Sequence, residues 1–410
     1  MAPTNWYKIS GSSSVVLPSG VYMQADPLDS AMKWTALLNR DLSWTCCSST
    51  NAPLGETGWT LLTNNQVLMV ESHSEQNMCY SDPSHLGYEL YDYNSNQWTC
   101  NGGTPPHTSP QNVAQGYHTN EIGAAVMMYN GYVLQFGADD TNPSTALYKV
   151  GGDWKAGPVP PFASPPNDSL HLIQTDGPAV LEPNGKVLAL MSPWLCNQHP
   201  DCMGSCDPTL QCGAPGPCDA VEYTPSSDGS GIGIFNLQTK PNMCTIGNSS
   251  LPGHMLLLPN GQIMLAYYAT ELELFTPDLN LSDWPKVAPH IISTGPLTLK
   301  KGQPTAIIGT QFNGLSQANM YGDDFQDATN FPIAQLSTGS DCQHLLPVAL
   351  VPTGNDFGNP ISNPPNSIQP NNETGTYVTV PQSQNTGSYW LSVITNGIPS
   401  DNCIWVTVVP

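Results

Sequence analysis

The stretch Gly253-His254-Met255-Leu256-Leu257-Leu258-Pro259-Asn260-Gly261-Gln262-Ile263-Met264-Leu265 predicts two antiparallel strands joined by a tight turn. Apolar residues run as far as Leu258 and resume at Ile263, with Asn260-Gly261 between them. An Asn-Gly pair between two apolar runs is the strongest short-range signal of a hairpin, because a type I′ turn needs positive φ at both central residues. We therefore expect a β-hairpin with a type I′ turn here.

The same pattern occurs in four earlier segments, which cover residues 11–23, 56–70, 121–134 and 176–190. Most of these segments are followed by a third short apolar strand and then by a fourth strand, often near a tryptophan. A four-stranded unit that recurs every ~40–60 residues is typical of a propeller blade. The sequence thus predicts an all-β protein with five blades, and a sixth blade could lie within residues 1–50.

The pattern changes after residue 288. Strands of the sandwich type are predicted at Thr305–Thr310, Tyr377–Val380, Tyr389–Ile394 and Ile404–Val409. About 120 residues of such strands fit an immunoglobulin-like sandwich. We expect two domains, a β-propeller over residues 1–288 and an immunoglobulin-like sandwich over residues 289–410.

The surface charge restricts the choice of partner. The chain has 10 basic and 32 acidic residues and a formal net charge of −22. Such a surface repels nucleic acid and anionic lipid, and no apolar run approaches the ~20 residues that cross a bilayer. The expected partner is a small-molecule substrate, with neither nucleic acid nor membrane involved.

Cysteine usage indicates an oxidising compartment. The chain has 12 cysteines and no C-x-x-C pair, which favours disulfides over a zinc site. Five of the cysteines lie between Trp194 and Asp219, which predicts a cross-linked loop. We expect a protein that is secreted or held in the secretory lumen. N-glycans are expected at four sequons, which begin at Asn167, Asn248, Asn280 and Asn372.

A family resemblance follows from motifs in the last third of the chain. Gly309–Gln317, Tyr321-Gly322-Asp323-Asp324 and Asn396–Ser400 resemble the C-terminal domain of secreted galactose-oxidase-like kelch proteins. A propeller followed by a sandwich is also similar to the galactose oxidase architecture. The resemblance implies blades of the kelch type.

The resemblance also implies where a copper site would lie, and this sequence departs from it. In the fifth repeat Gly253 stands in the place of the family's tyrosine beside His254, and about Ile122 stands in the place of the radical tyrosine. Asn330 stands where the family has the histidine of its sandwich domain. Copper(II) needs several nitrogen and oxygen donors. We therefore expect neither a metal nor another cofactor.

Titratable residues are predicted to converge on an axial funnel. The beginnings of four inner strands carry Glu56, Glu121, Asp176 and His254, and His118 lies just before Glu121. Carboxylates beside a histidine can act as general acid and base. The predicted catalytic residues are His118, Glu121, Asp176 and His254, and the predicted substrate contacts are Glu56, Tyr117, Trp194 and Asn330. The alternative is that these groups form hydrogen bonds with neighbouring blades.

Two classes of function remain. The first is a metal-independent enzyme of secondary metabolism that dehydrates and cyclises a small apolar or phenolic substrate in the funnel. In its architecture the chain resembles fungal biosynthetic cyclases, including hetero-Diels–Alderases. The alternative is a non-catalytic propeller that binds glycans or cell walls, and a copper radical oxidase ranks third.

Overall fold

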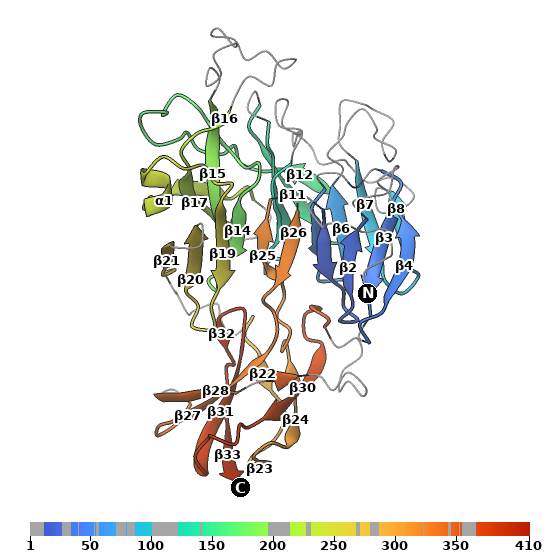
Figure 1. Cartoon of the computed structure of the whole chain (residues 1–410), viewed down its shortest axis with the longest axis vertical. Helices are drawn as coiled ribbons and strands as arrows, with labels where there is room; N and C mark the ends of the chain where they lie inside the picture. The colour runs from blue at the N-terminus through green and yellow to red at the C-terminus, as the bar shows by residue number, and fades with distance from the viewer. Residues whose placement is uncertain are drawn as a thin grey trace.

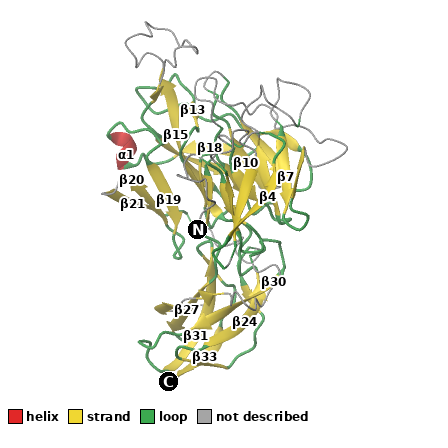
Figure 2. Ribbon diagram, turned by 45° about the vertical axis from the view of Figure 1, so that its right-hand side comes forward, coloured by secondary structure: helices red, strands yellow, loops and turns green. Residues whose placement is uncertain are grey.

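The computed structural model is almost entirely β, with a propeller at one end and a sandwich at the other (Figures 1 and 2). It contains one described helix, α1 (Asn242–Thr245), whose four residues are far too few to span a bilayer. The structure describes residues 12–26, 34–39, 41–52, 54, 57–70, 79, 87–100, 122–139, 142–195, 214–226, 231–267, 271–278, 287–322, 324–342, 346–351, 353–354 and 366–410.

The described strands form five blades, one for each predicted repeat. The first blade contains β1 (Ser14–Val16), β2 (Tyr22–Ala25), β3 (Trp34–Leu38) and β4 (Trp44–Ser49). The second contains β5 (Trp59–Leu61), β6 (Gln66–Val70), β7 (Tyr88–Asp92) and β8 (Gln97–Cys100). The third contains β9 (Ala125–Met127), β10 (Tyr132–Phe136), β11 (Thr145–Lys149) and β12 (Trp154–Ala156).

The fourth blade contains β14 (Pro178–Leu181), β15 (Val187–Leu195), β17 (Asp219–Thr224) and β18 (Ile234–Leu237), while β13 (Leu172–Ile173) and β16 (Ala214–Pro215) pair with β15. The fifth has three described strands, β19 (Gly253–Leu257), β20 (Ile263–Tyr267) and β21 (Glu271–Phe275). The described part of residues 1–50 is taken up by the first blade, so it adds no sixth one.

The hairpin at Asn260-Gly261 forms as predicted, but the type I′ turn was wrong. Only Gly261 has positive φ (82°), and the turn closes through Leu258 N–H to Gln262 O at 2.8 Å and Gly261 N–H to Leu258 O at 2.9 Å. These bonds define a three-residue loop, a type I turn followed by a residue in the left-handed region. Pro259 has no N–H to donate to Gln262 O, as a two-residue turn at Asn260-Gly261 would require, and its φ near −65° suits the first position of a type I turn.

All five blades use this three-residue turn between their first two strands. The residue in the left-handed region is a glycine or an asparagine in each case: Gly20, Asn65, Gly131, Gly185 and Gly261. In four blades the preceding asparagine also accepts a backbone hydrogen bond, as Asn260 Oδ1 does from Gln262 N–H at 3.1 Å. A single local signal therefore sets the register of every blade.

A hairpin from the C-terminal part of the chain fills the propeller axis. It consists of β25 (Ala318–Tyr321) and β26 (Phe325–Ala328), drawn in orange at the centre of the propeller in Figure 1. β25 pairs with β14, and β26 pairs with β1. Between them the two strands contact the innermost strand of all five blades. Backbone therefore occupies the axis along these strands, and the funnel predicted at the beginnings of the inner strands stays a prediction.

The sandwich consists of two sheets around one apolar core. One sheet contains β22 (His290–Ile291), β24 (Pro304–Thr310), β30 (Glu373–Thr379) and β29 (Thr353–Gly354). The other contains β23 (Leu297–Lys300), β33 (Ile404–Val409), β31 (Gly387–Thr395), β27 (Ile333–Thr338), β28 (Leu346–Val351) and β32 (Ile398–Pro399). Ile307, Phe312, Leu391 and Val406 are fully buried in the core. The exact domain boundary at residue 288 stays a prediction.

Three disulfides connect described cysteines. They join Cys79 to Cys100, Cys218 to Cys244, and Cys342 to Cys403. Such cross-links are compatible with an extracellular or secretory-pathway protein.

Candidate functional site

The axial hairpin presents a different set of side chains on each of its two faces. Tyr321 is paired with Phe325, and Asn319 with Asp327, so these four side chains share one face. This face is directed toward the fifth blade, because Asn319 Nδ2 donates to Met255 O of β19 at 3.1 Å. The aromatic rings and the carboxylate of the hairpin therefore lie beside β19.

His254 of β19 stacks on this face. Its ring lies 4.7 Å from that of Tyr321 and 6.5 Å from that of Phe325, with interplanar angles of 18° and 12°. The Tyr321 and Phe325 rings are themselves parallel within 11° at 5.2 Å. Stacking holds the imidazole in one orientation while its edge remains exposed. His254 is thus a positioned, accessible proton carrier.

Asp327 is the carboxylate coupled to His254. Its side chain is exposed at the surface of a pocket, yet the surrounding protein removes enough water from the carboxyl group to raise its pKa. The positive charge of a protonated His254 acts in the opposite direction and lowers the Asp327 pKa. A carboxyl group beside an imidazole is suited to act with it as an acid–base pair.

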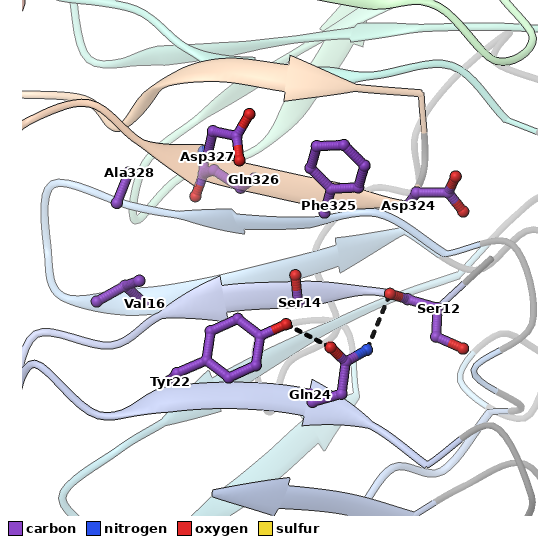
Figure 3. Close-up of a pocket in the computed structure, with 10 residues that line it drawn as sticks. All are labelled: Ser12, Ser14, Val16, Tyr22, Gln24, Asp324, Phe325, Gln326, Asp327 and Ala328. Atoms are coloured by element: carbon purple, nitrogen blue, oxygen red, sulfur yellow. Dashed lines mark hydrogen bonds between the residues drawn. The ribbon is translucent and has the colours of Figure 1, made fainter. Parts of the chain in front are cut away.

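The pocket has a volume of about 410 Å³ and lies over β26, β1 and β2 (Figure 3). Its lining is mostly polar and consists of Ser12, Ser14, Val16, Tyr22, Gln24, Asp324, Phe325, Gln326, Asp327 and Ala328. Gln24 is fixed in place, because its Nε2 donates to Ser12 O at 3.0 Å and its Oε1 accepts from the Tyr22 hydroxyl. Burial raises the pKa of Tyr22, so this residue stays a neutral hydroxyl donor.

Asp176, which precedes β14, lies beside Gly322 in the turn between β25 and β26. It is half-buried, and burial raises its pKa. Its backbone carbonyl accepts from the Ser250 hydroxyl at 3.0 Å. Gly322 has a φ of +48°, and a Cβ built on it would lie 3.0 Å from Asp176 Oδ1. Glycine is therefore required both by the turn and by the close approach of this carboxylate.

Two of the four predicted catalytic residues are described, and both lie against the hairpin. Asp176 borders Gly322, and His254 stacks on Tyr321. Trp194 lies half-buried near the end of β15, paired with Pro215 of β16. His118 and Glu121, together with the predicted contacts Glu56 and Tyr117, lie outside the described residues.

Asn330 was predicted to contact substrate, and the structure places it in the interior. It is 0% exposed, and its Nδ2 donates to Asn313 O at 3.0 Å. The side chains from the C-terminal part of the chain that face His254 are instead Tyr321 and Phe325, and the carboxylate that its charge influences is Asp327. Asp327, Tyr321 and Phe325 were not predicted from the sequence. Their alternation on either side of the Gly322 turn was the available signal.

The donors among the described residues do not fit the copper site that the family resemblance implies. His254 has Gly253 as its neighbour where a tyrosine ligand would be needed, and a buried asparagine, Asn330, whose Nδ2 donates to Asn313 O, stands where the family's histidine would be. One described cluster brings three ligand atoms together, Cys79, Glu89 and Cys100. Its two thiols form a disulfide, and Glu89 accepts the backbone N–H groups of Asn51 and Ala52 at 2.8 Å. We derive no step through copper.

Comparison with known proteins identifies similar folds only. No protein-family model matches the sequence, and no curated protein matches it. A fungal alcohol oxidase of the AA5 family, in complex with copper, is 12% identical over 98% of this chain and 86% of its own, with a TM-score of 0.37. Virginiamycin B lyase from Staphylococcus aureus is 10% identical over 96% of this chain and 94% of its own, with a TM-score of 0.34.

A sugar-binding protein also occurs among these structures. The Aleuria aurantia lectin, in complex with Fucα1-6GlcNAc, is 13% identical over 88% of this chain and 100% of its own, with a TM-score of 0.37. At these identities the similarity concerns the fold alone.

Proposed function

We propose that this protein is an enzyme that uses His254 and Asp327 for general acid–base chemistry on a small, uncharged, hydroxylated molecule. The observation that carries the proposal is the placement of His254, stacked on Tyr321 and Phe325 and coupled to Asp327, which lines a pocket of about 410 Å³. Pockets of ~300–1,000 Å³ are typical for small-molecule ligands. A neutral ligand fits best, since the described residues that line the pocket include two carboxylates and no cationic side chain.

The reaction that suits this pair is the elimination of water, the first step of a dehydration and cyclisation. The protonated member of the pair donates a proton to a substrate hydroxyl, the C–O bond breaks, and water leaves. The other member removes a proton from a neighbouring O–H or C–H group, and those electrons form the new double bond. Proton transfers of this kind contribute about 10²–10⁴-fold each. The resulting unsaturated product is then held for ring closure by the pocket walls.

A mixture of candidate substrates is sufficient to test the dehydration. Neutral metabolites from the source organism are incubated with the wild-type protein and with Asp327→Asn, and the mixtures are compared by mass spectrometry. We expect the wild type to convert at least one compound into a product that is lighter by one water molecule. The variant is expected to be about 10²–10⁴-fold slower.

His254→Ala provides the second arm of this test, and thermal unfolding of both variants is the control. Both side chains are exposed, so the melting temperatures should stay close to that of the wild type. Conversion by both variants at the wild-type rate would disprove the assignment.

Sugar binding without turnover is the second candidate function. Phe325 offers an aromatic surface in the pocket, surrounded by the hydroxyl, amide and carboxylate groups of Ser14, Gln24 and Asp327. A glycan array would separate the two candidates, because a lectin would bind a specific glycan and leave it unchanged. Secretion, N-glycosylation and kelch-type blades stay part of the proposal.

A further inference from the structure

A second cavity lies where the fifth blade meets the sandwich. It has a volume of about 250 Å³ and runs between the end of β19 and the beginning of β27. The described residues that line it include no charged side chain; they are Leu256, Leu257, Leu258, Pro259, Ala328, Thr329, Phe331, Ile333, Ile394, Asn396 and Gly397. We call this cavity the junction groove.

The junction groove adjoins the site at the hairpin in two ways. Ala328, the last residue of β26, lines both the groove and the pocket that contains Asp327. Leu256 follows His254 by two residues on β19, so both side chains lie on the same exposed face of that strand. A ligand that contacts His254 and Asp327 at one end can therefore extend along Leu256 into the groove.

Two large apolar side chains of the groove are open to solvent. Phe331 is 51% exposed and Leu256 is 39% exposed. Exposed apolar side chains that gather in one place are typical of ligand-binding grooves. Burying them under an apolar ligand removes apolar surface from water and so favours binding.

We propose that the junction groove binds the apolar part of the substrate whose hydroxylated part lies between His254 and Asp327. The substrate is accordingly an amphiphile, a hydroxylated head joined to a hydrocarbon tail or ring system. This inference rests on the proposed function for the head, whereas the tail site stands on the uncharged lining and on its continuity with the pocket. The sandwich supplies Phe331, Ile333 and Ile394, so substrate selection is shared between the propeller and the sandwich.

A series of 4-alkylphenols with lengthening alkyl chains tests the groove directly. Their dissociation constants are measured by calorimetry on the intact wild-type protein and on Phe331→Ser. In the wild type, each added methylene should tighten binding about two- to fourfold until the groove is filled. In Phe331→Ser the gain per methylene should fall to less than half on the logarithmic scale.

Phe162→Ser is the matched control, because Phe162 is also 51% exposed and lies on the propeller away from the groove. It should keep the wild-type dependence on chain length. Asp327→Asn separates the two proposals, since it should lose turnover and retain the gain per methylene.

Two results would overturn the groove proposal. The first is the same gain per methylene in Phe331→Ser and the wild type. The second is a dimer, detected by sedimentation velocity, that Phe331→Ser converts to a monomer, because the occupant would then be a second copy of the chain.

Discussion

Gln326 and Asp327 are neighbours in β26, and they have opposite surroundings. Gln326 is buried, and its Oε1 accepts the backbone N–H of Leu61 in the second blade at 2.9 Å. Asp327 is exposed to the pocket, and the charge of a protonated His254 in the fifth blade lowers its pKa. On its buried face the axial hairpin bonds to the second blade through Gln326, while the face of Asp327 combines the Asn319 bond to the fifth blade with the groups suited to chemistry.

This difference explains how a propeller can have its axis filled and still offer a site. The second and third blades also pack closely on each other. At their junction the ring of Tyr88 lies 5.6 Å from that of Tyr148 and 5.8 Å from that of Trp154. On the other side, Leu272 and Leu274 of β21 are 69% and 59% exposed. Closely packed blades supply rigidity, and the exposed side supplies access.

The largest expected effect is a loss of turnover when Asp327, on the exposed face of the axial hairpin, is replaced. Asp327→Asn should reduce turnover about 10²–10⁴-fold, because the amide cannot exchange a proton with the substrate. Its free energy of unfolding should change by less than about 0.5 kcal/mol, as for other surface substitutions. A steady-state assay combined with urea unfolding measures both quantities. A large loss of stability together with the loss of activity would contradict the division between the faces.

Glu182 extends the comparison to a carboxyl group that is fully buried. It lies in the turn of the fourth blade, and burial, followed by the charge of Glu222, raises its pKa to about 7. Because its pKa is higher in the folded state than in the unfolded state, the free energy of unfolding decreases as the pH rises from about 4.5 to about 7. Glu182→Gln should be more stable than the wild type by about 3 kcal/mol at pH 8 and equal to it at pH 4.

Urea unfolding of Glu182→Gln and the wild type at both pH values measures this difference. A stability gain at pH 4 as large as that at pH 8 would refute the ionisation argument.

Gln326→Ala tests the packed face. The substitution leaves the Leu61 N–H buried without its acceptor, which costs about 1–3 kcal/mol of unfolding free energy. Gln326→Glu serves as its companion, since a carboxylate retains an acceptor at that position but brings a charge into the interior. Chemical denaturation should show both variants destabilised. Wild-type stability in Gln326→Ala would show that this face does not hold the blades.

The smallest effect is expected at Tyr321, and it separates the ring from the hydroxyl group. Tyr321→Phe retains the stacking with His254 and loses the hydrogen bond to Leu251 O. We expect at most about 1 kcal/mol of lost stability and nearly unchanged turnover. Tyr321→Ser, which removes the ring, should reduce turnover further. Equal activity in the two variants would show that the stacking does not position the imidazole.

The sequence was sufficient for the features that depend on local patterns. The five repeats and their hairpins were predicted, because apolar alternation and the residues around Gly20, Gly185 and Gly261 act over a few positions. The turn type was missed, because the Asn-Gly signal was weighed without the missing N–H of Pro259. The positions of segments that are far apart in the sequence but adjacent in the fold could not be predicted from such local patterns.

The site shows where that limit lies. Asp176 and His254 were found because each is at the beginning of an inner strand, and the structure places both beside the hairpin. Asp327 was missed because its role depends on a hairpin that leaves the sandwich and enters the propeller. Pairing of β25 with β14, across about 140 residues of sequence, leaves no local pattern in either segment. Asn330 was chosen by analogy with a family motif, and the structure shows it to be buried.

The pKa of Asp327 is the most direct measure of the central claim that the exposed face of the hairpin holds an interacting acid–base pair. Carbon-13 NMR of aspartate-labelled protein would follow its carboxyl group through an acid titration, with Asp327→Asn used to assign the signal. We predict a midpoint above the ordinary aspartate value in the wild type, and a still higher one in His254→Ala, because the charge of His254 lowers the pKa. Identical midpoints in the two proteins would contradict the account.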